Sequence, residues 1–404
     1  MPLYVGVMSG TSLDGVDVAT VRLEGEEERP SAARMEAFRS RPWDDAFRHR
    51  LERACRDGSV GEISDLGFEL GRRFAAAVLE ALEEAGTADS DVAAVGSHGQ
   101  TVWHHPPGEG GRGGPPDGDV PRSVPVGRPG PEGTAESAAG ASTLQIGEPA
   151  VIAEETGLPV VSDFRVRDVA AGGHGAPLTA YFDRLLLTSE ERARGIQNLG
   201  GMGNVTALPP AASGVGPAAF DTGPGTALLD AAARRLSGGE RRMDRDGEMA
   251  ASGCVLPGAL EPWLEDPFFA EPPPRSTGRE RFGPDRLEVW LEEHRTERPE
   301  DLLATLTELT ARTVADALRW LDFPLEEMYL CGGGARNPEL VRRLRRRMDP
   351  VPVRDLSELG WDPDAREAAA FALLARQHLL GVPASAPWAT GARGPRILGK
   401  LTPV

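Results

Sequence analysis

Four short glycine turns, each directly after an expected strand, constrain the fold of this 404-residue chain more than any other feature. The turns are Gly10–Gly15, Gly200–Gly203, Gly223–Gly225 and Gly332–Gly334. The strand before the first of them is the apolar run Leu3–Met8, and segments with helical periodicity separate the turns. Strand, glycine turn and helix therefore alternate along the chain, which predicts an α/β protein.

A glycine turn after a strand has two interpretations. In the first, glycine only supplies the positive φ that a tight turn needs. In the second, the backbone N–H groups of the turn converge on an anion. Four such turns in one chain favour phosphate binding. Two of them are glycine-bearing turns between paired strands, which is the pattern of a duplicated domain with ATP between its halves.

The charge pattern excludes several classes of protein. The net charge of −18 argues against a general nucleic-acid or anionic-membrane binder, because phosphate contact needs a basic surface. Lys400 is the only lysine. A Walker-type P-loop and a protein kinase both require a lysine in their phosphate site, so both classes are excluded.

The cysteines and the apolar segments predict a cytoplasmic protein. Cys55, Cys254 and Cys331 form no closely spaced pair, so neither a disulfide framework nor a zinc site is expected. The N-terminus lacks the pattern of a secretory signal, and no apolar run is long enough to span a membrane.

The segment 107–133 differs in composition from the rest of the chain. It holds nine glycines and seven prolines among 27 residues, with almost no large apolar side chain. Such a composition cannot support a core, so we expect a disordered surface insertion.

Acidic residues stand beside two of the turns. Asp14 and Asp17 lie in or just after the first, and Asp221 begins the third. In a phosphate site without lysine, Mg²⁺ must supply much of the neutralising charge, and carboxylates or their waters hold it. The alternative for any one of these residues is an Asx-turn.

The motif Met8–Asp17 resembles the opening motif of the anhydro-N-acetylmuramic acid kinases. Further motifs similar to those of this family follow in order over essentially the whole chain, 107–133 excepted: Gly96–Thr101, Asp163–Asp168, Gly172–Leu178, Asn198–Gly201, Phe220–Gly225, Asp244–Gly247, Ser276–Glu280 and Cys331–Asn337. Departures at His174, Thr179 and Thr226 affect the expected fine specificity more than the class of reaction.

The resemblance implies a fold and a reaction. The fold is that of actin and hexokinase, with two ribonuclease-H-like lobes and a central ATP cleft. We place lobe I at 1–163 plus 385–404 and lobe II at 164–384. Members of the family use ATP and water to open the 1,6-anhydro ring of anhydro-N-acetylmuramic acid and to phosphorylate O6. A homodimer is the family expectation.

The resemblance also implies a nucleotide site. The first turn is expected to cradle the phosphates, with Mg²⁺ held mainly through phosphates and waters and Asp14 as a candidate ligand. The turn at Gly332 is expected to pack against adenosine. The residues so assigned are Gly10, Thr11, Ser12, Leu13, Asp14, Gly15, Val16, Asp17, Gly200, Gly201, Gly223, Gly225, Gly332, Gly333, Gly334 and Asn337.

The sugar site and the catalytic base complete these expectations. Asp221 is assigned as the base that takes the proton of the attacking water, with Asp168 as the alternative, whose other role would be to hold a sugar hydroxyl or Arg167. Arg167 is expected to pair with the lactyl carboxylate. The remaining expected sugar-site residues are Ser97, His98, Thr101 and Glu367. His98 has a second interpretation as a packed, hydrogen-bonded histidine, and Glu367 as a partner of its helix dipole.

The sequence also allows two rival functions. One is an ATPase module of the actin or chaperone kind, whose ATP hydrolysis would be insensitive to anhydro-sugars. The other is a kinase of the same fold that acts on a free sugar. Turnover of anhydro-N-acetylmuramic acid beside ordinary hexoses separates them.

Overall fold

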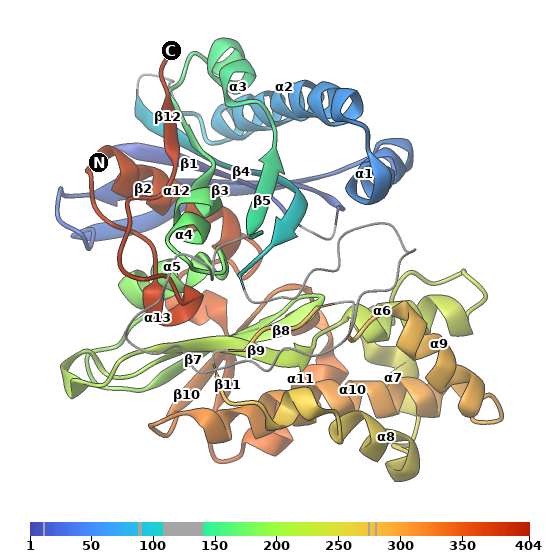
Figure 1. Cartoon of the computed structure of the whole chain (residues 1–404). Coiled ribbons are helices and arrows are strands. Elements are labelled where there is room, and N and C mark those ends of the chain that lie inside the picture. Colours follow the sequence, from blue (N-terminus) through green and yellow to red (C-terminus); the bar gives the residue numbers. More distant parts are fainter. Residues whose placement is uncertain (11–12, 88–90, 108–139, 274, 279–280) are drawn as a thin grey trace. The chain divides into compact units, whose positions relative to one another are not determined.

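A computed structural model describes residues 1–10, 13–87, 91–107, 140–273, 275–278 and 281–404 (Figure 1). The segment 107–133, expected to be a disordered insertion, lies outside the described residues from 108 onward. The chain divides into two compact units. Unit 1 consists of Met1–Phe182 and Glu367–Val404, and unit 2 of Asp183–Arg366.

Unit 1 is built on a mixed sheet with the strand order β12-β6-β4-β1-β2-β3, and β5 pairs with β4. Strands β1, β2 and β3 are antiparallel neighbours, whereas β4 runs parallel to both β1 and β6. The strands are β1 Leu3–Ser9, β2 Gly15–Glu24, β3 Ala32–Pro42, β4 Val92–His105, β5 Ser142–Ile146, β6 Val160–Ser162 and β12 Lys400–Thr402.

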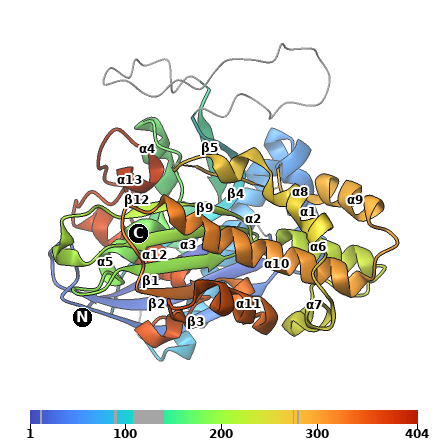
Figure 2. The same cartoon turned by 90° about the horizontal axis from the view of Figure 1, so that it is seen from below.

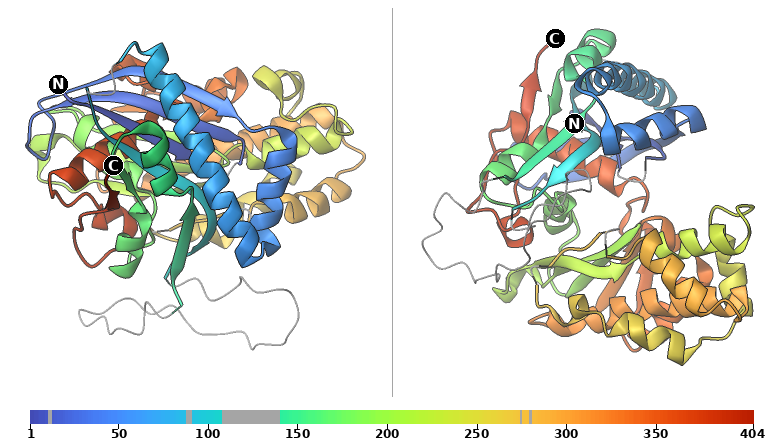
Figure 3. Two further views of the ribbon diagram at one scale, coloured as in Figure 1. Left: turned by 90° about the horizontal axis from the view of Figure 1, so that it is seen from above. Right: turned by 45° about the vertical axis from the view of Figure 1, so that its right-hand side comes forward.

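Both faces of this sheet are covered by helices. Val5 and Val7 of β1 pack in one core with Leu66 and Leu70 of α2, a helix that Figure 3 shows lying along the sheet. Gly6 alternates with these valines and faces α12. The helices of unit 1 are α1 Asp45–Asp57, α2 Val60–Glu84, α3 Pro149–Thr156, α4 Phe164–Ala170, α12 Arg366–Leu379 and α13 Pro387–Thr390, with α5 Thr179–Leu186 at the unit boundary.

Unit 2 has a five-stranded sheet with the order β11-β10-β7-β8-β9. Strands β7, β8 and β9 are antiparallel neighbours, and β10 runs parallel to both β7 and β11. The strands are β7 Arg194–Leu199, β8 Met202–Leu208, β9 Ala218–Pro224, β10 Glu327–Cys331 and β11 Val353–Asp355.

The helices of unit 2 pack on this sheet and on one another. Leu199 and Met328 of the sheet share a core with Val314 of α10 and Leu340 of α11, and Figure 2 shows α10 running across the unit. The helices are α6 Ala227–Leu236, α7 Glu248–Ser252, α8 Pro257–Leu264, α9 Pro284–Glu293, α10 Pro299–Ala317 and α11 Pro338–Met348.

The two sheets repeat one topology, with β1-β2-β3-β4-β6 of unit 1 corresponding to β7-β8-β9-β10-β11 of unit 2. In each, three antiparallel strands are followed by two that run parallel to the first. This arrangement confirms the expected α/β fold class with two ribonuclease-H-like lobes.

The boundaries between the units differ from the expected 163/164 and 384/385, since they lie at 182/183 and 366/367. Helices α4 and α12 account for the difference because both pack within unit 1. Phe371 of α12, for example, lies 5.4 Å, between ring centroids, from Phe164 of α4.

Candidate active site

The first glycine turn joins β1 to β2, and Gln100 of β4 holds it by hydrogen bonds. The Ser9 hydroxyl oxygen lies 2.8 Å from the Gly15 carbonyl oxygen and 2.7 Å from Gln100 Oε1. Gln100 Nε2 donates to the Gly10 carbonyl at 3.0 Å. Both ends of the turn are therefore anchored to buried polar groups. The sequence reasoning placed Gln100 in a motif but gave it no role.

The other expected residues of this turn are placed only in part. Thr11 and Ser12 lie outside the described residues. Leu13 has a left-handed φ of 56°, a strained conformation for a leucine, and Asp14 is exposed. Val16 is buried in the core of unit 1.

Asp17 is a largely buried carboxylate just after this turn. Its pKa is raised to about 6, mainly by burial and in part by the negative charges of Asp14 and Glu367, whereas a hydrogen bond from Ser40 opposes the shift. The carboxylates of three expected site residues therefore lie near enough to repel one another.

Replacing Asp17 by asparagine is expected to stabilise the protein above pH 6. A folded-state pKa raised from 3.8 to about 6 means that the fold favours the protonated carboxyl, so stability is lost as pH rises through 6. Asparagine resembles the protonated form. Because solvent screens part of the effect, we expect the free energy of unfolding to rise by about 1–2 kcal/mol at pH 8 and not at all near pH 4. Urea unfolding at the two pH values measures it. Asp57→Asn, on the exposed surface, is the control. An equal gain at both pH values would contradict the electrostatic origin.

In unit 2, the second and third glycine turns lie directly against each other. Gly225 N–H donates to the Gly201 carbonyl at 3.0 Å, and Thr226 N–H donates to the Gly200 carbonyl at 2.8 Å. A Cβ atom on Gly225 would lie 2.0 Å from the Gly200 carbonyl oxygen. Glycine is therefore required at this position by close backbone packing.

The fourth turn, Gly332–Gly334, also packs against the end of β7. A Cβ atom on Gly332 would lie 2.3 Å from Asn198 Oδ1, and one on Gly334 would lie 2.8 Å from Leu199 Cβ. Three of the four sequence-predicted turns thus meet at the end of β7. Asn337, expected near adenosine, caps α11, since its Oδ1 accepts from the N–H groups of Glu339 and Leu340.

Asp221 lies on β9 and is held by a loop that the sequence did not single out as its support. Its Oδ2 accepts a hydrogen bond from Thr277 N–H at 2.9 Å, and Arg275 Nε donates to its carbonyl at 3.0 Å. Arg275 is buried, its guanidinium lies 4.7 Å from the ring centroid of Phe268, and burial lowers its pKa to about 10. It stays charged at neutral pH beside Asp221.

A second polar cluster lies in unit 1. His98 on β4 is buried, and its Nε2 lies 2.8 Å from Nε of Arg165 on α4. Arg165 also donates to the Gly175 carbonyl. His98 was expected either to contact the sugar or to be a packed, hydrogen-bonded histidine, and no role was predicted for Arg165, although it lies within a recognised motif.

Asp168 is fully buried in this cluster. One carboxylate oxygen accepts from Gly175 N–H at 2.8 Å and the other from the Thr390 hydroxyl at 2.9 Å. Burial raises the pKa of Asp168, and these two hydrogen bonds oppose the shift. Its visible partners are thus a glycine loop and α13. The expected partner Arg167 is exposed, on the same helix.

The remaining expected sugar-site residues also belong to unit 1. Ser97 is buried, and its hydroxyl has no hydrogen-bond partner among the described residues. Thr101 Oγ1 accepts a hydrogen bond from Gln145 at 3.3 Å. Glu367 stands in the first turn of α12, and its charge acts on both Asp17 and Arg165.

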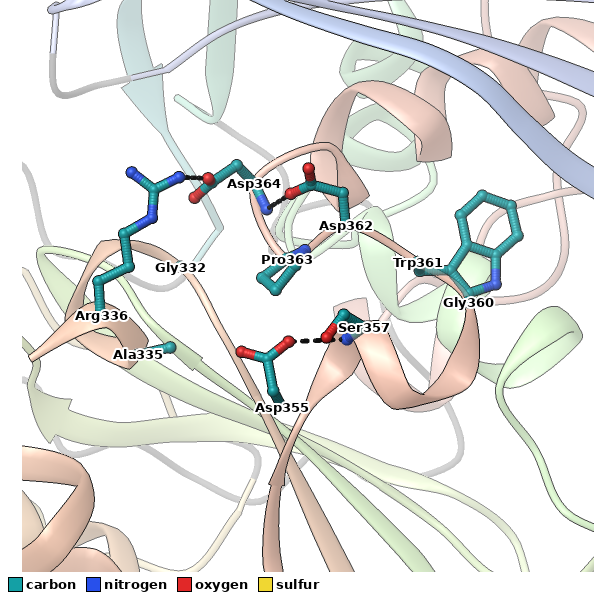
Figure 4. Close-up of a pocket in the computed structure, with 10 residues that line it drawn as sticks. All are labelled: Gly332, Ala335, Arg336, Asp355, Ser357, Gly360, Trp361, Asp362, Pro363 and Asp364. Carbon is teal, nitrogen blue, oxygen red and sulfur yellow. Dashed lines mark hydrogen bonds and ion pairs between the residues drawn. The ribbon is translucent and has the colours of Figure 1, made fainter. Parts of the chain in front are cut away.

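A cavity of about 520 Å³ lies next to the fourth turn, entirely within unit 2 (Figure 4). Its wall comes from the Gly332 turn and from the segment that follows β11. Figure 4 shows the hydrogen bond from Ser357 N–H to Asp355 Oδ1 and the ion pair between Arg336 and Asp364. The lining residues are Gly332, Ala335, Arg336, Asp355, Ser357, Gly360, Trp361, Asp362, Pro363 and Asp364. Sequence reasoning missed the segment 355–364, which carries no motif.

Among the described residues, no group of three or more His, Cys, Asp or Glu side chains is placed to hold a metal ion. In the same residues, no helix has the length and apolar character needed to cross a membrane.

Two units with the same strand order and a glycine-bearing hairpin turn in each define a duplicated ribonuclease-H-like protein. The family model described as anhydro-N-acetylmuramic acid kinase matches residues 2–112 and 134–404, and so leaves out most of the glycine- and proline-rich segment. The chain belongs to this family of kinases.

Individual relatives agree with this assignment. The anhydro-N-acetylmuramic acid kinase of Acaryochloris marina is 40% identical over 406 residues, which cover 98% of each chain. That of Gloeobacter violaceus is 41% identical and covers 99% of this chain and 98% of its own. Among solved structures, the activator of the 2-hydroxyisocaproyl-CoA dehydratase from Clostridium difficile matches with a TM-score of 0.43 and 13% identity, covering 93% and 94% of the chains. This last similarity is too low to bear on the fold.

Proposed function

We propose that this chain uses ATP and water to convert 1,6-anhydro-N-acetylmuramic acid to N-acetylmuramic acid 6-phosphate and ADP. The observation that carries the proposal is the match to relatives of that name over both units. In the reaction, the bond between O6 and C1 breaks, a water oxygen bonds to C1, and O6 takes the γ-phosphoryl group. A base takes one proton from the water.

The experiment compares ADP release with anhydro-N-acetylmuramic acid, N-acetylglucosamine and glucose under identical conditions. We expect turnover of the anhydro-sugar alone, and ¹⁸O from labelled water in the C1 hydroxyl of the product. ATP hydrolysis that ignores the anhydro-sugar would favour an ATPase module. Faster turnover of a free hexose would favour another sugar kinase.

We place the phosphates of ATP at the glycine turns. The hydrogen bonds from Ser9 and Gln100 that anchor the first turn support its role, because a preorganised turn presents its N–H groups without further ordering cost. The mutual packing of the turns around Gly200 and Gly225 supports the same role in unit 2.

Gly10→Val is expected to abolish ATP binding and to leave the sugar site formed. The branched side chain would block the approach of phosphate to the backbone and would restrict the turn. Calorimetry should show an ATP affinity at least about 10²-fold weaker, equivalent to about 2.7 kcal/mol. Wild-type ATP affinity would remove the first turn from the phosphate site.

We place the adenosine in the cavity beside Gly332. Its volume of about 520 Å³ is within the range of small-ligand sites, and the polar groups of Asp355 and Ser357 offer hydrogen bonds. This placement keeps the expected role of the turn and adds the segment 355–364 to it.

Magnesium fits the acidic residues beside the first turn. The charges of Asp14 and Glu367 both raise the pKa of Asp17, and a divalent cation would relieve this repulsion. Carboxylate and water oxygens are the ligands that Mg²⁺ prefers. We assign exposed Asp14 to hold it through water; when bound, the ion neutralises phosphate charge.

The sugar is assigned to unit 1, beside the polar cluster of His98, Arg165 and Asp168, because this unit contains all the expected sugar-site residues. For the base we keep Asp221, which is partly exposed and firmly oriented by Thr277 and Arg275. Asp168 is the second candidate. Two observations favour it: burial raises its pKa toward the range of a general base, and it lies in the same unit as the sugar-site residues.

The quaternary state and the location of the protein remain proposals. We propose a homodimer in the cytoplasm, as the resemblance implies. Sedimentation equilibrium at micromolar concentration tests the first, and fractionation of the producing cells tests the second.

A further inference from the structure

The hydrogen bonds of His98 fix the tautomer of its ring. Nδ1 lies 2.7 Å from the Gly99 carbonyl oxygen, and Nε2 lies 2.8 Å from Arg165 Nε. A guanidinium only donates hydrogen bonds, so Nε2 must carry a lone pair, and Nδ1 must carry the proton that it donates to Gly99. Burial and the charge of Arg165 also hold the pKa of His98 well below its usual range. The ring is neutral, and both nitrogen atoms are occupied.

Arg165 connects this histidine to the loop 172–175. Arg165 lies in the first turn of α4. Its Nε faces His98, and its Nη1 donates to the Gly175 carbonyl at 2.5 Å. Burial lowers its pKa to about 10, and the charges of Glu367 and Asp168 oppose this change. The guanidinium therefore stays charged at neutral pH and bridges two elements.

Gly175 is held from both sides. Its carbonyl accepts from Arg165, and its N–H donates to Asp168 Oδ2. Its φ of +70° suits glycine, and a Cβ atom would lie 2.9 Å from Val169 Cγ2. A continuous series of contacts therefore runs from His98 through Arg165 and Gly175 to the Asp168 carboxylate.

We propose that His98 and Arg165 are positioning residues for the reaction proposed above, on which this inference rests. Neutral His98 orients Arg165, and Arg165 fixes Gly175 and thereby the direction of the Asp168 carboxylate. His98 then serves the site through Arg165, a role that extends the second interpretation of its sequence motif, that of a packed, hydrogen-bonded histidine. This role applies whether Asp168 is the base or a support for the loop.

Two pairs of variants test the proposal through kcat and KM. Arg165→Ala should lower kcat at least about 30-fold if Asp168 is the base, and should raise the KM for the sugar by the same factor if Asp168 supports the sugar site. In either case millimolar guanidinium should restore part of the lost activity. Arg165→Lys should not restore it, because one ammonium cannot reproduce the two fixed bonds. His98→Gln supplies an acceptor for Arg165 and should keep most activity, whereas His98→Phe should resemble Arg165→Ala. The controls are Arg56→Ala and His49→Gln, two exposed residues of α1.

A readout independent of turnover separates this inference from the proposed function. Nitrogen-15 NMR of His98 should show the neutral Nδ1–H tautomer from pH 5.5 to 8 in wild type, and protonation of Nε2 at a higher pH in Arg165→Ala, because that nitrogen has lost its donor and the neighbouring positive charge. A protonated or Nε2–H ring would overturn the inference even in an active enzyme. A sugar KM raised more than tenfold in His98→Gln with kcat unchanged would overturn it too, because direct sugar contact predicts that result. Should Arg165→Ala fail to fold, the His98 pair still decides. Absence of wild-type turnover refutes the proposed function alone.

Discussion

Asp221→Asn is expected to lower turnover at saturating ATP and anhydro-sugar by at least about 10²-fold, the usual range for loss of a general base. Asparagine keeps the shape of the side chain, and its oxygen can still accept from Thr277 N–H, so the loop should remain in place. What it lacks is the basic lone pair that takes the proton of the attacking water. ATP affinity should therefore change little. Pre-steady-state kinetics and calorimetry measure the two quantities separately.

Two variants show whether the effect belongs to Asp221 itself. Asp316→Asn, on the exposed surface of α10 in the same unit, should leave turnover unchanged. Asp168→Asn, if that residue supports the sugar site, should act mainly on the apparent affinity for the anhydro-sugar. If Asp168→Asn abolished turnover at saturating sugar while Asp221→Asn remained nearly normal, Asp168 would be the base.

The repeated fold could be predicted because its signals are local. A glycine turn between two short apolar runs identifies a hairpin from about fifteen residues of sequence. The turn around Gly200 was recognised in this way, the turns around Gly225 and Gly332 were recognised as glycine turns between a strand and a helix, and the structure brings all three together. Their convergence follows from the strand order, since the ends of β7, β9 and β10 lie at neighbouring places in one sheet.

The missed features depend on contacts between distant segments. Arg165 and His98 are 67 positions apart, and only their pairing reveals that the histidine is an acceptor. The wall of the cavity at 355–364 carries no motif, because a concave surface arises from packing. The observed unit boundaries differ from the expected ones for the same reason. Whether α12 belongs to one unit or the other depends on which sheet accepts it at close range.

Gly96→Val is expected to destabilise unit 1 by at least about 3 kcal/mol, at the upper end of the range for overpacked sites. Gly96 lies in β4 directly beneath α12, and a Cβ atom there would lie 2.1 Å from the Phe371 carbonyl oxygen. A Cβ atom on Gly6 of β1 would lie 1.8 Å from the Ala368 carbonyl oxygen of the same helix. The helix thus rests on the backbone of two strands, with no side chain between them. The obstructing atoms belong to a helix backbone, so no rotamer change can relieve the clash.

The sign of this effect is informative because strand propensity predicts the opposite. Valine is a better strand former than glycine, so a position without steric constraint would gain stability. Gly61→Ala provides the matched control: it lies near the start of α2, a Cβ atom there meets nothing within 4 Å, and the change should be neutral or stabilising by up to about 1 kcal/mol. Urea unfolding of both variants measures the difference. If Gly96→Val unfolded at the wild-type urea concentration, α12 could not lie against β4 as described, and its assignment to unit 1 would have to be withdrawn.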